Sequence, residues 1–570
     1  MKKLFLFILI TILSFTLISC TKHTNDRIDN VEFNALLDEA FLEFLGTDPL
    51  NVNYSLMYPE EYGITDLTVM PYSFLTSELQ EDFLDLKDLK NRIIVFSDDT
   101  LSNSQILTKK ILIDYIDRHL LLENFSGYDA ILNSSLGYQL MLPFSLAEYR
   151  FDDLADINHY FDYLSTTKDT FENIISYESI RSNSNIGLTD TAIDKIITQC
   201  EDLINQEENY LIEVFNQKID NLSFLTETEK TSLKAENLNL IETDFIDAYI
   251  YLKDALVSLK GVVTHNGAIC NYLNGMDYYQ ASFQANIGSD LTIPELEDYL
   301  EVKLSRLLIN YSLNQSKYNS KFSIDLMEGL EVDNLIEYFK TNMSDFPLLD
   351  IEIEYEVKEM YENMQDSVAA AMYLISPIDT NSKEYIYLNP TSLTDVNNTL
   401  FQTVAHESYP GHLFQHVYFK NTDAHDVRKI IDYTGYSEGW AKYIENEVVG
   451  MVDSSAKKAI EYMDTSSSII ICLLDIGIHY HGWDLSEATT FLNNYFQLET
   501  SQVEELYNSL LEIPLMYMEY FFTYFQIQDL KTNFKDKMGS DYSDLLFHTI
   551  LLDIGPAPFS ILEEVFENYK

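Results

Sequence analysis

The chain is poor in the residues that make tight turns, because its 570 residues include only 18 glycines and 12 prolines. A turn-rich β-sandwich or propeller of this length needs many more of both. Only four cysteines are present, and no two of them form a Cys-x-x-Cys pair. This argues against a disulfide framework and against a thiolate zinc knuckle, although a single bridge between Cys200 and Cys270 stays open.

Positive charge is also scarce, with 36 Lys and Arg against 92 Asp and Glu and a formal net charge of −56. Such a surface repels a phosphate backbone, so nucleic acid is not an expected partner. The acidic residues are spread along the chain, as is typical of solvated helix faces. Apolar residues make up 46% and aromatic residues 13%, which excludes a disordered chain and favours a packed, mainly α-helical protein.

A long apolar run occurs at the N-terminus, where two lysines precede the uncharged residues 4–19. This pattern predicts a secretory signal peptide over 1–19, because the run is shorter than the ~20 residues that span a bilayer. The run ends in Leu-Ile-Ser-Cys20, which resembles a bacterial lipobox. The resemblance implies cleavage before Cys20, lipidation of its thiol, and a protein anchored by lipid to the outer face of the cell membrane.

The rest of the chain reads as a polar tether over 20–30 followed by one large helical domain over 31–570. Residues with helical periodicity predict long helices, and no repeat or long linker interrupts them. These helices are expected over 104–123, 189–217, 243–259, 293–314 and 454–478. Alternation with period two at 351–357, and the apolar stretch at 384–388, predict the strands of a small sheet.

Three of the eleven histidines fall within residues 401–416. A zinc peptidase helix usually reads His-Glu-x-x-His, because positions i and i+4 place two imidazoles on one face. Here the histidine after His406-Glu407 is His412, at i+6, which lies ~120° around a regular helix. Pro410 has no N–H to donate and Gly411 tolerates a bent backbone, so a break is expected that lets His406 and His412 converge on one metal ion.

A third ligand is needed to leave one coordination position open, as catalytic zinc sites do. Glu438, 26 residues after His412, is the candidate, because that separation lets a second helix pack against the first. Spacing alone leaves open that Glu438 is one more surface carboxylate. A second ligand set is also open, since His416 lies four residues after His412, although no Glu follows His412 to act as a base.

These residues together resemble the paired signatures of a bacterial family, domain of unknown function 885. The matching motifs are His406-Glu-Ser-Tyr-Pro-Gly-His412 with Gln415, Glu438-Gly-Trp-Ala-x-Tyr443, Asp475-x-Gly-x-His479-x-x-Gly-Trp483 and Leu551-Leu-Asp-Ile-Gly-Pro-Ala-Pro558. The family is grouped with zincin metallopeptidases that use a Glu ligand.

The resemblance implies a large, mainly α-helical zincin-like fold with a small β-sheet beside the metal-binding helix. It also implies a site within 345–570, in which one Zn²⁺ per chain is held by His406, His412 and Glu438 and Glu407 is the base. Many relatives have a second His where this chain has Leu413, so that His is not an essential ligand.

Further candidates come from the remaining motifs. His479 is a candidate donor to the oxyanion of a tetrahedral intermediate, with Asp475 one turn earlier fixing its tautomer; a buried structural histidine is the alternative. Tyr385 and Tyr387, on the strand before the metal helix, are candidates for substrate contacts, although packing in the core explains them equally well. Tyr520 is matched to a Tyr that relatives carry near the C-terminus, without the neighbouring Gly.

The function predicted from these residues is an extracytoplasmic zinc-dependent peptidase. Zinc lowers the pKa of a water, Glu407 takes its proton, and the substrates are oligopeptides that reach a cleft. If the strand at 384–388 is an exposed edge, it pairs with an extended peptide by strand addition. The alternative is a non-catalytic, lipid-anchored surface binding protein on a zincin scaffold.

Overall fold

The computed structural model describes residues 27–74, 76–206, 209–314, 332–365, 370–392, 399–452 and 454–570. The predicted signal peptide, the lipidated Cys20 and the first part of the tether lie outside these residues. Among the helices that are described, none is long and apolar enough to cross a membrane.

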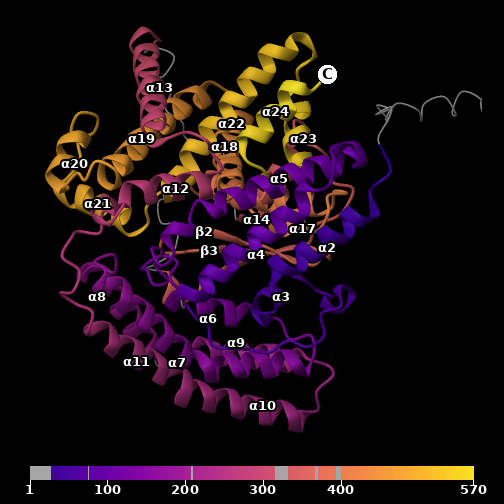
Figure 1. The fold of residues 1–570 in the computed structure, drawn as a ribbon, viewed down its shortest axis with the longest axis vertical. Helices are drawn as coiled ribbons and strands as arrows, with labels where there is room; N and C mark the ends of the chain where they lie inside the picture. The colour runs from indigo at the N-terminus through magenta and orange to yellow at the C-terminus, as the bar shows by residue number, and fades with distance from the viewer. Residues whose placement is uncertain are drawn as a thin grey trace, which may run out of the picture.

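The architecture is mainly α-helical with one small sheet, as predicted (Figure 1). Before the sheet come α2 (Val31–Leu45), α3 (Pro49–Ser55), α4 (Thr76–Ile94), α5 (Asn103–Leu120), α6 (Tyr138–Glu148), α7 (Leu154–Asn183), α8 (Asp190–Ile204), α9 (Tyr210–Asn221), α10 (Glu227–Leu240), α11 (Ile246–Val257), α12 (Gly275–Ile287), α13 (Ile293–Asn314) and α14 (Val332–Thr341). The strands are β1 (Tyr355–Glu359), β2 (Ala371–Leu374) and β3 (Glu384–Leu388). After the sheet come α15 (Thr399–Glu407), α16 (His412–Lys420), α17 (Val427–Ile430), α18 (Thr434–Val452), α19 (Ser454–His479), α20 (Leu485–Leu492), α21 (Thr500–Glu512), α22 (Met516–Met538), α23 (Asp544–Ile554) and α24 (Phe559–Asn568).

Helix ends follow their capping residues where the sequence carries them. The helix expected over 293–314 is confirmed as α13, and the one expected over 454–478 corresponds to α19. The single helix expected over 189–217 is wrong, because α8 ends at Ile204 and α9 starts at Tyr210. The side chain of Asn209 accepts a hydrogen bond from the N–H of Leu211 and so caps a new helix.

The sheet has the strand order β1-β3-β2, with β1 parallel and β2 antiparallel to β3. The predicted strand at 384–388 is therefore confirmed, but the expectation that it is an exposed edge is wrong. The third strand, β2, was not predicted, because its four residues are too few to show an alternating pattern. β2 is an edge of the sheet and packs beside α15.

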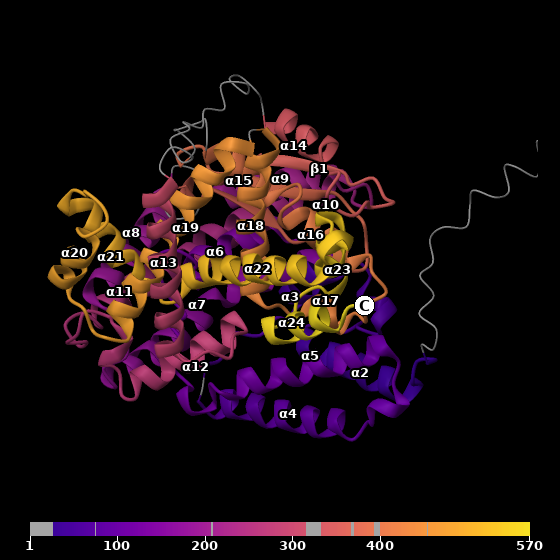
Figure 2. The same ribbon diagram turned by 90° about the horizontal axis from the view of Figure 1, so that it is seen from above.

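The helices enclose two separate large hydrophobic cores. One core is built from α7–α11 and the segments that pack on them, which we call the small lobe. The other joins the sheet to α12–α24 and to the N-terminal helices, and we call this part the large lobe. In Figure 1 the small lobe lies below the large lobe, and Figure 2 shows α4 and α5 side by side along an edge remote from α15.

The closest helix crossing in the large lobe is that of α18 with α22. A Cβ on Gly439 would lie 2.8 Å from the Cβ of Thr523 and 2.9 Å from its backbone carbonyl carbon. A Cβ on Gly435 would lie 2.7 Å from the Cγ2 of Thr523 and 2.9 Å from the carbonyl oxygen of Ile287. These two glycines let the backbones of α18, α22 and α12 approach one another beside Glu438.

We expect Gly439→Ala to lower the free energy of unfolding by about 1–3 kcal/mol, because its methyl group meets backbone atoms of α22 that have no room to move. Gly450→Ala is the matched control on the same helix, since its Cβ meets only the flexible end of Lys457. There we expect a gain of up to ~1 kcal/mol from helix propensity. Urea unfolding in the presence of a chelator measures both, and equal effects would contradict the crossing described here.

Candidate metal centre

The two histidines of the central motif lie on either side of a helix break. α15 ends at Glu407 and α16 begins at His412, as the proline and glycine between them predict. Gly411 passes so close to the carbonyl oxygen of His406 that a Cβ has no room there. The indole N–H of Trp440 donates to the carbonyl oxygen of Pro410 at 3.0 Å and ties the break to α18.

The break brings His406 and His412 together with Glu438. The two imidazole rings have their centroids 4.7 Å apart. The Nε2 atoms of His406 and His412 each lie 3.5 Å from Oε2 of Glu438. One ligand atom from each residue thus falls within 4.8 Å of the other two.

The carboxylate of Glu438 shows that this cluster suits a cation. Its Oε2 atom is buried, and among the described residues it has no hydrogen-bond partner. Burial alone would raise the pKa of Glu438, but His412 and His406 outweigh it and hold the pKa well below its usual range. An ionised oxygen and two imidazole nitrogens that face one point form the nitrogen and oxygen donor set of a catalytic zinc site with one open position.

A second layer of polar groups orients His406. Its Nδ1 atom lies 2.8 Å from Oε1 of Glu445, one turn and a half beyond Lys442 on the same chain as Glu438. Lys442 forms ion pairs with Glu445 at 2.6 Å and with Asp464 at 3.1 Å. Burial lowers the pKa of His406, but Glu438 and Glu445 outweigh burial and raise it to about 10, so a bound cation must displace a proton.

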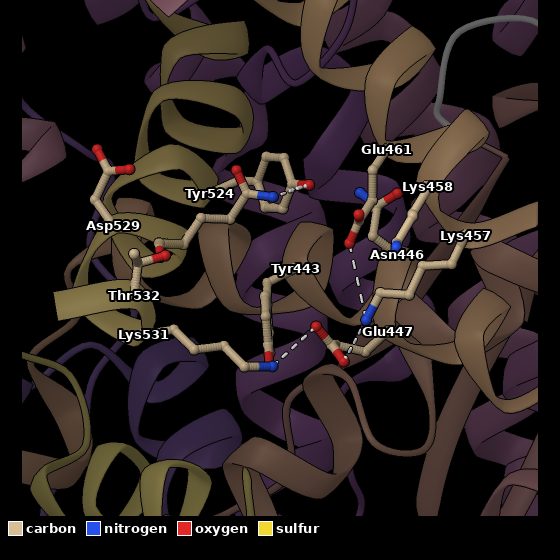
Figure 3. Close-up of a pocket in the computed structure, with 11 residues that line it drawn as sticks. Tyr443, Asn446, Glu447, Lys457, Lys458, Glu461, Tyr524, Asp529, Lys531 and Thr532 are labelled. Carbon is tan, nitrogen blue, oxygen red and sulfur yellow. Dashed lines mark hydrogen bonds and ion pairs between the residues drawn. The ribbon is translucent and has the colours of Figure 1, made fainter. Parts of the chain in front are cut away.

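The acidic residue two positions further along α18 has a different role. Glu447 lines a polar pocket of about 520 Å³, in which Lys457 and Lys531 reach its carboxylate (Figure 3). Their Nζ atoms lie 2.7 Å and 3.1 Å from Glu447 oxygens. The hydroxyl of Tyr443 accepts a further hydrogen bond from Lys531 at 2.6 Å. This pocket is a network of paired charges, and Glu447 does not contact the metal centre.

Glu407 lies beside the cluster and is held by the sheet. Its Oε2 atom accepts a hydrogen bond from the backbone N–H of Tyr373 in β2 at 2.7 Å. Its Oε1 atom lies 4.0 Å from Nε2 of His406. Glu407 is thus anchored through one oxygen, while the other faces the space that His406, His412 and Glu438 surround.

The structure also brings Tyr520 to this site. Its ring stacks on the ring of His406, with centroids 6.1 Å apart and an angle of 18° between the planes. Burial and the nearby carboxylates of Glu438 and Glu407 raise the pKa of Tyr520 well above its usual value. The phenol therefore keeps its proton and is available as a hydrogen-bond donor.

His479 and Asp475 do not have the roles expected of them. Both are fully buried, and His479 uses Nε2 to donate to the carbonyl oxygen of Leu510 at 2.8 Å. Its Nδ1 atom accepts from the N–H of Ile269 at 3.2 Å, so no N–H is left for an oxyanion. Asp475 accepts hydrogen bonds from Tyr279 and from the N–H of Leu515 rather than orienting His479. The pair holds α19 against neighbouring segments.

Tyr385 and Tyr387 pack with the sheet, and in the described residues neither ring contacts the metal centre. Lys358 lies over the ring of Tyr385 at 4.0 Å from its centroid. Tyr387 is fully buried, and its hydroxyl accepts a hydrogen bond from Lys358 at 2.9 Å. Their places in the sheet agree with core packing, the alternative that the sequence left open.

Two other open alternatives are decided by contacts. The Nε2 atom of His416 lies 3.0 Å from the carbonyl oxygen of Ser376, outside the cluster, so His416 does not stand in for His406. Burial and Lys420 lower the pKa of His416 to about 3. Cys200 and Cys270 are both free thiols and do not form a bridge.

Sequence reasoning missed Glu445, although its position carries a signal. Glu445 follows Glu438 by seven residues, and residues seven apart lie on the same face of a helix. A carboxylate on that face, two turns from a metal ligand, suits the partner that a ligating histidine commonly has on its other ring nitrogen. The backbone N–H of Tyr373 left no trace in the sequence, because its position depends on the strand pairing.

The fold and the cluster define a mainly helical protein with a His-His-Glu candidate metal centre. The family described as bacterial protein of unknown function (DUF885) matches residues 76–566, and the chain belongs to this family. Two solved structures are similar over nearly the whole chain. A candidate lipoprotein from Colwellia psychrerythraea has a TM-score of 0.81 at 17% identity, covering 94% of this chain and 98% of that one. A candidate lipoprotein of unknown function from Shewanella oneidensis has a TM-score of 0.62 at 14% identity, covering 95% and 100%. No curated protein matches the chain.

We expect the purified protein, reconstituted with Zn²⁺, to hold about one zinc ion per chain in elemental mass spectrometry. His412→Ala should lose this ion because it removes one of three ligands. His416→Ala is the control that separates the two ligand sets, and it should keep the ion. Loss of zinc in both variants alike would contradict the cluster described here.

The second layer gives a separate prediction. Glu445→Gln should weaken zinc affinity by ~10–100-fold, because the amide no longer holds His406 in the ligating orientation as firmly. Glu447→Gln is the matched control on α18, since its carboxylate binds Lys457 and Lys531. Competition with a chromophoric chelator measures both affinities. An unchanged affinity in Glu445→Gln would show that His406 needs no support from α18.

Proposed function

We propose that this protein is an extracytoplasmic zinc-dependent peptidase that hydrolyses oligopeptides. The observation that carries the proposal is the buried, unpartnered Oε2 atom of Glu438, which faces Nε2 of both His406 and His412. A zinc ion held by these three side chains would supply Lewis-acid chemistry, polarising a carbonyl group and making water a stronger acid. The adjacent Glu407 gives the site a base.

The side chains around the cluster divide the work of amide hydrolysis. Glu407 takes a proton from the attacking water with its free oxygen and passes that proton to the leaving amine. The N–H of Tyr373 holds the other oxygen, so the carboxylate keeps its orientation. Tyr520, which keeps its proton, donates a hydrogen bond to the developing oxyanion, the part first assigned to His479.

Oligopeptides are the proposed substrates because the outer edge of β2 is suited to strand addition. The N–H of Asn389 pairs with the carbonyl oxygen of Ala370, so in the antiparallel ladder Ala371 and Tyr373 direct their backbone groups away from β3. The hydrogen bond from Tyr373 to Glu407 shows that this outer edge runs beside the proposed base. An extended peptide that pairs with β2 therefore lies next to Glu407.

The proposed location is the outer face of the cell membrane, with a lipid on Cys20 as the anchor. The Leu-Ile-Ser-Cys20 sequence supports this, and so do the descriptions of both similar solved structures as candidate lipoproteins. An exported protein of net charge −56 that is held by one lipid keeps its catalytic lobe in the aqueous phase.

We expect Glu407→Gln to lower kcat for peptide hydrolysis by ~10²–10⁴-fold, because it removes the base and leaves the three metal ligands in place. Zinc content and circular dichroism should stay at wild-type values. Full activity in this variant would refute the mechanism. An absence of hydrolysis in the zinc-loaded wild type, tested on a broad peptide library, would instead favour a non-catalytic binding protein on the same scaffold.

A further inference from the structure

A second cavity lies between the two lobes, with a volume of about 540 Å³, which is in the range of specific ligand sites. We call it the interlobe pocket. Its small-lobe wall includes the start of α8 with Thr191, and its large-lobe wall includes Asn286 of α12 and the segment 507–515 of and after α21. Figure 1 shows α8 below α12 and α21, at the junction of the lobes.

The interlobe pocket is continuous with the metal centre through two elements. Leu515, which lines the pocket, immediately precedes α22, and Tyr520 follows in the second turn, ~7–8 Å further along the helix axis. Asn286, on the other element, precedes Ile287, whose carbonyl oxygen packs against Gly435, three residues before Glu438. A peptide bound at the metal centre therefore has the pocket within reach of one of its side chains.

The charged groups that line this pocket are engaged by the protein itself. Arg181 forms a buried ion pair with Glu178, and Glu512 pairs with Lys195 and with the hydroxyl of Ser134. Their charges are compensated before any ligand arrives.

The remaining acidic groups of the wall are engaged in the same way. Asp129 accepts a hydrogen bond from the hydroxyl of Tyr278 at 2.7 Å, and Asp190 accepts one from the N–H of Gly261 at 2.7 Å. A charged side chain that entered would lose its water and find no free opposite charge, which is costly.

The groups left free in the pocket are aromatic or uncharged. Tyr128 stands against Tyr278 and Tyr272, with ring centroids 4.9 Å and 6.1 Å away, and all three line the wall. Within the described part of the chain, the side chains of Asn286 and Asn508 have no hydrogen-bond partner and line the same space. Rings that stack and amides that bind uncharged polar groups favour a bulky neutral ligand.

We propose that the interlobe pocket receives one bulky, uncharged side chain of the peptide substrate, aromatic or aliphatic, and so determines the specificity of hydrolysis. This inference rests on the proposed peptidase function and names its substrate class. It runs against the net charge of −56, which by itself would favour basic peptides.

The test compares the cleavage profiles of zinc-loaded variants on a peptide library. We expect wild type to prefer Phe, Tyr and Leu over Lys, Arg and Asp by at least ~10-fold in kcat/KM at one position relative to the cleaved bond. Asn286→Asp should raise kcat/KM for Lys at that same position at least ~10-fold, and Asn286→Lys should do so for Asp and Glu. Thr191→Trp, from the opposite wall, should lower kcat/KM for Phe there and spare Ala.

The control is Asp277→Lys, an exposed charge change on α12 outside the pocket, which should leave the profile unchanged. Identical profiles in all variants, or a wild type that prefers Lys and Arg at every position, would overturn the inference and leave the peptidase function standing. If wild type cleaves nothing, the peptidase function fails. Calorimetric binding of Phe- and Lys-containing peptides to Glu407→Gln, with and without Asn286→Asp, then decides the pocket by itself. Equal or absent binding of the two peptides would overturn the inference there too.

Discussion

One buried carboxylate oxygen sets the terms for the rest of the large lobe. Oε2 of Glu438 is shielded from water, carries negative charge, and faces two imidazoles instead of a hydrogen-bond donor. A buried charge of this kind is costly unless an opposite charge compensates it. The arrangement is stable either with a protonated His406 or with a metal cation, and every neighbouring element holds one of these three side chains in place.

The motifs that define the family supply that support from a distance. Trp440 holds the carbonyl of Pro410 and thereby the break between α15 and α16. The fully buried Arg428 donates to the carbonyl oxygens of Ile554 and Pro556, both at 2.9 Å, and Gly555 leaves room for the ring of Phe419 in α16. The C-terminal Leu551–Pro558 motif therefore clasps the ligand helices without touching the metal centre.

Local signals in the sequence were read correctly, and signals that depend on partners were not. Pro410 and Gly411 predict a helix break because the missing N–H and missing Cβ act within one turn. His479 looked like a catalytic donor because its motif is polar, yet its two nitrogens are used by Ile269 and Leu510, which are far away in the chain. Conversely, Tyr520 was weakly indicated, and only the crossing of α22 over α18 carries it to His406.

The sequence by itself determined the helical class, the break that lets His406 and His412 converge, and the identity of the acidic third member, Glu438. Each of these depends on residues within a few turns of one another or on composition. Only the tertiary structure decided that β3 is central, that β2 presents its edge to Glu407, and that Glu445 holds His406. Those facts depend on which backbone groups remain unpaired once the strands and helices have packed, and no local pattern of residues encodes that outcome.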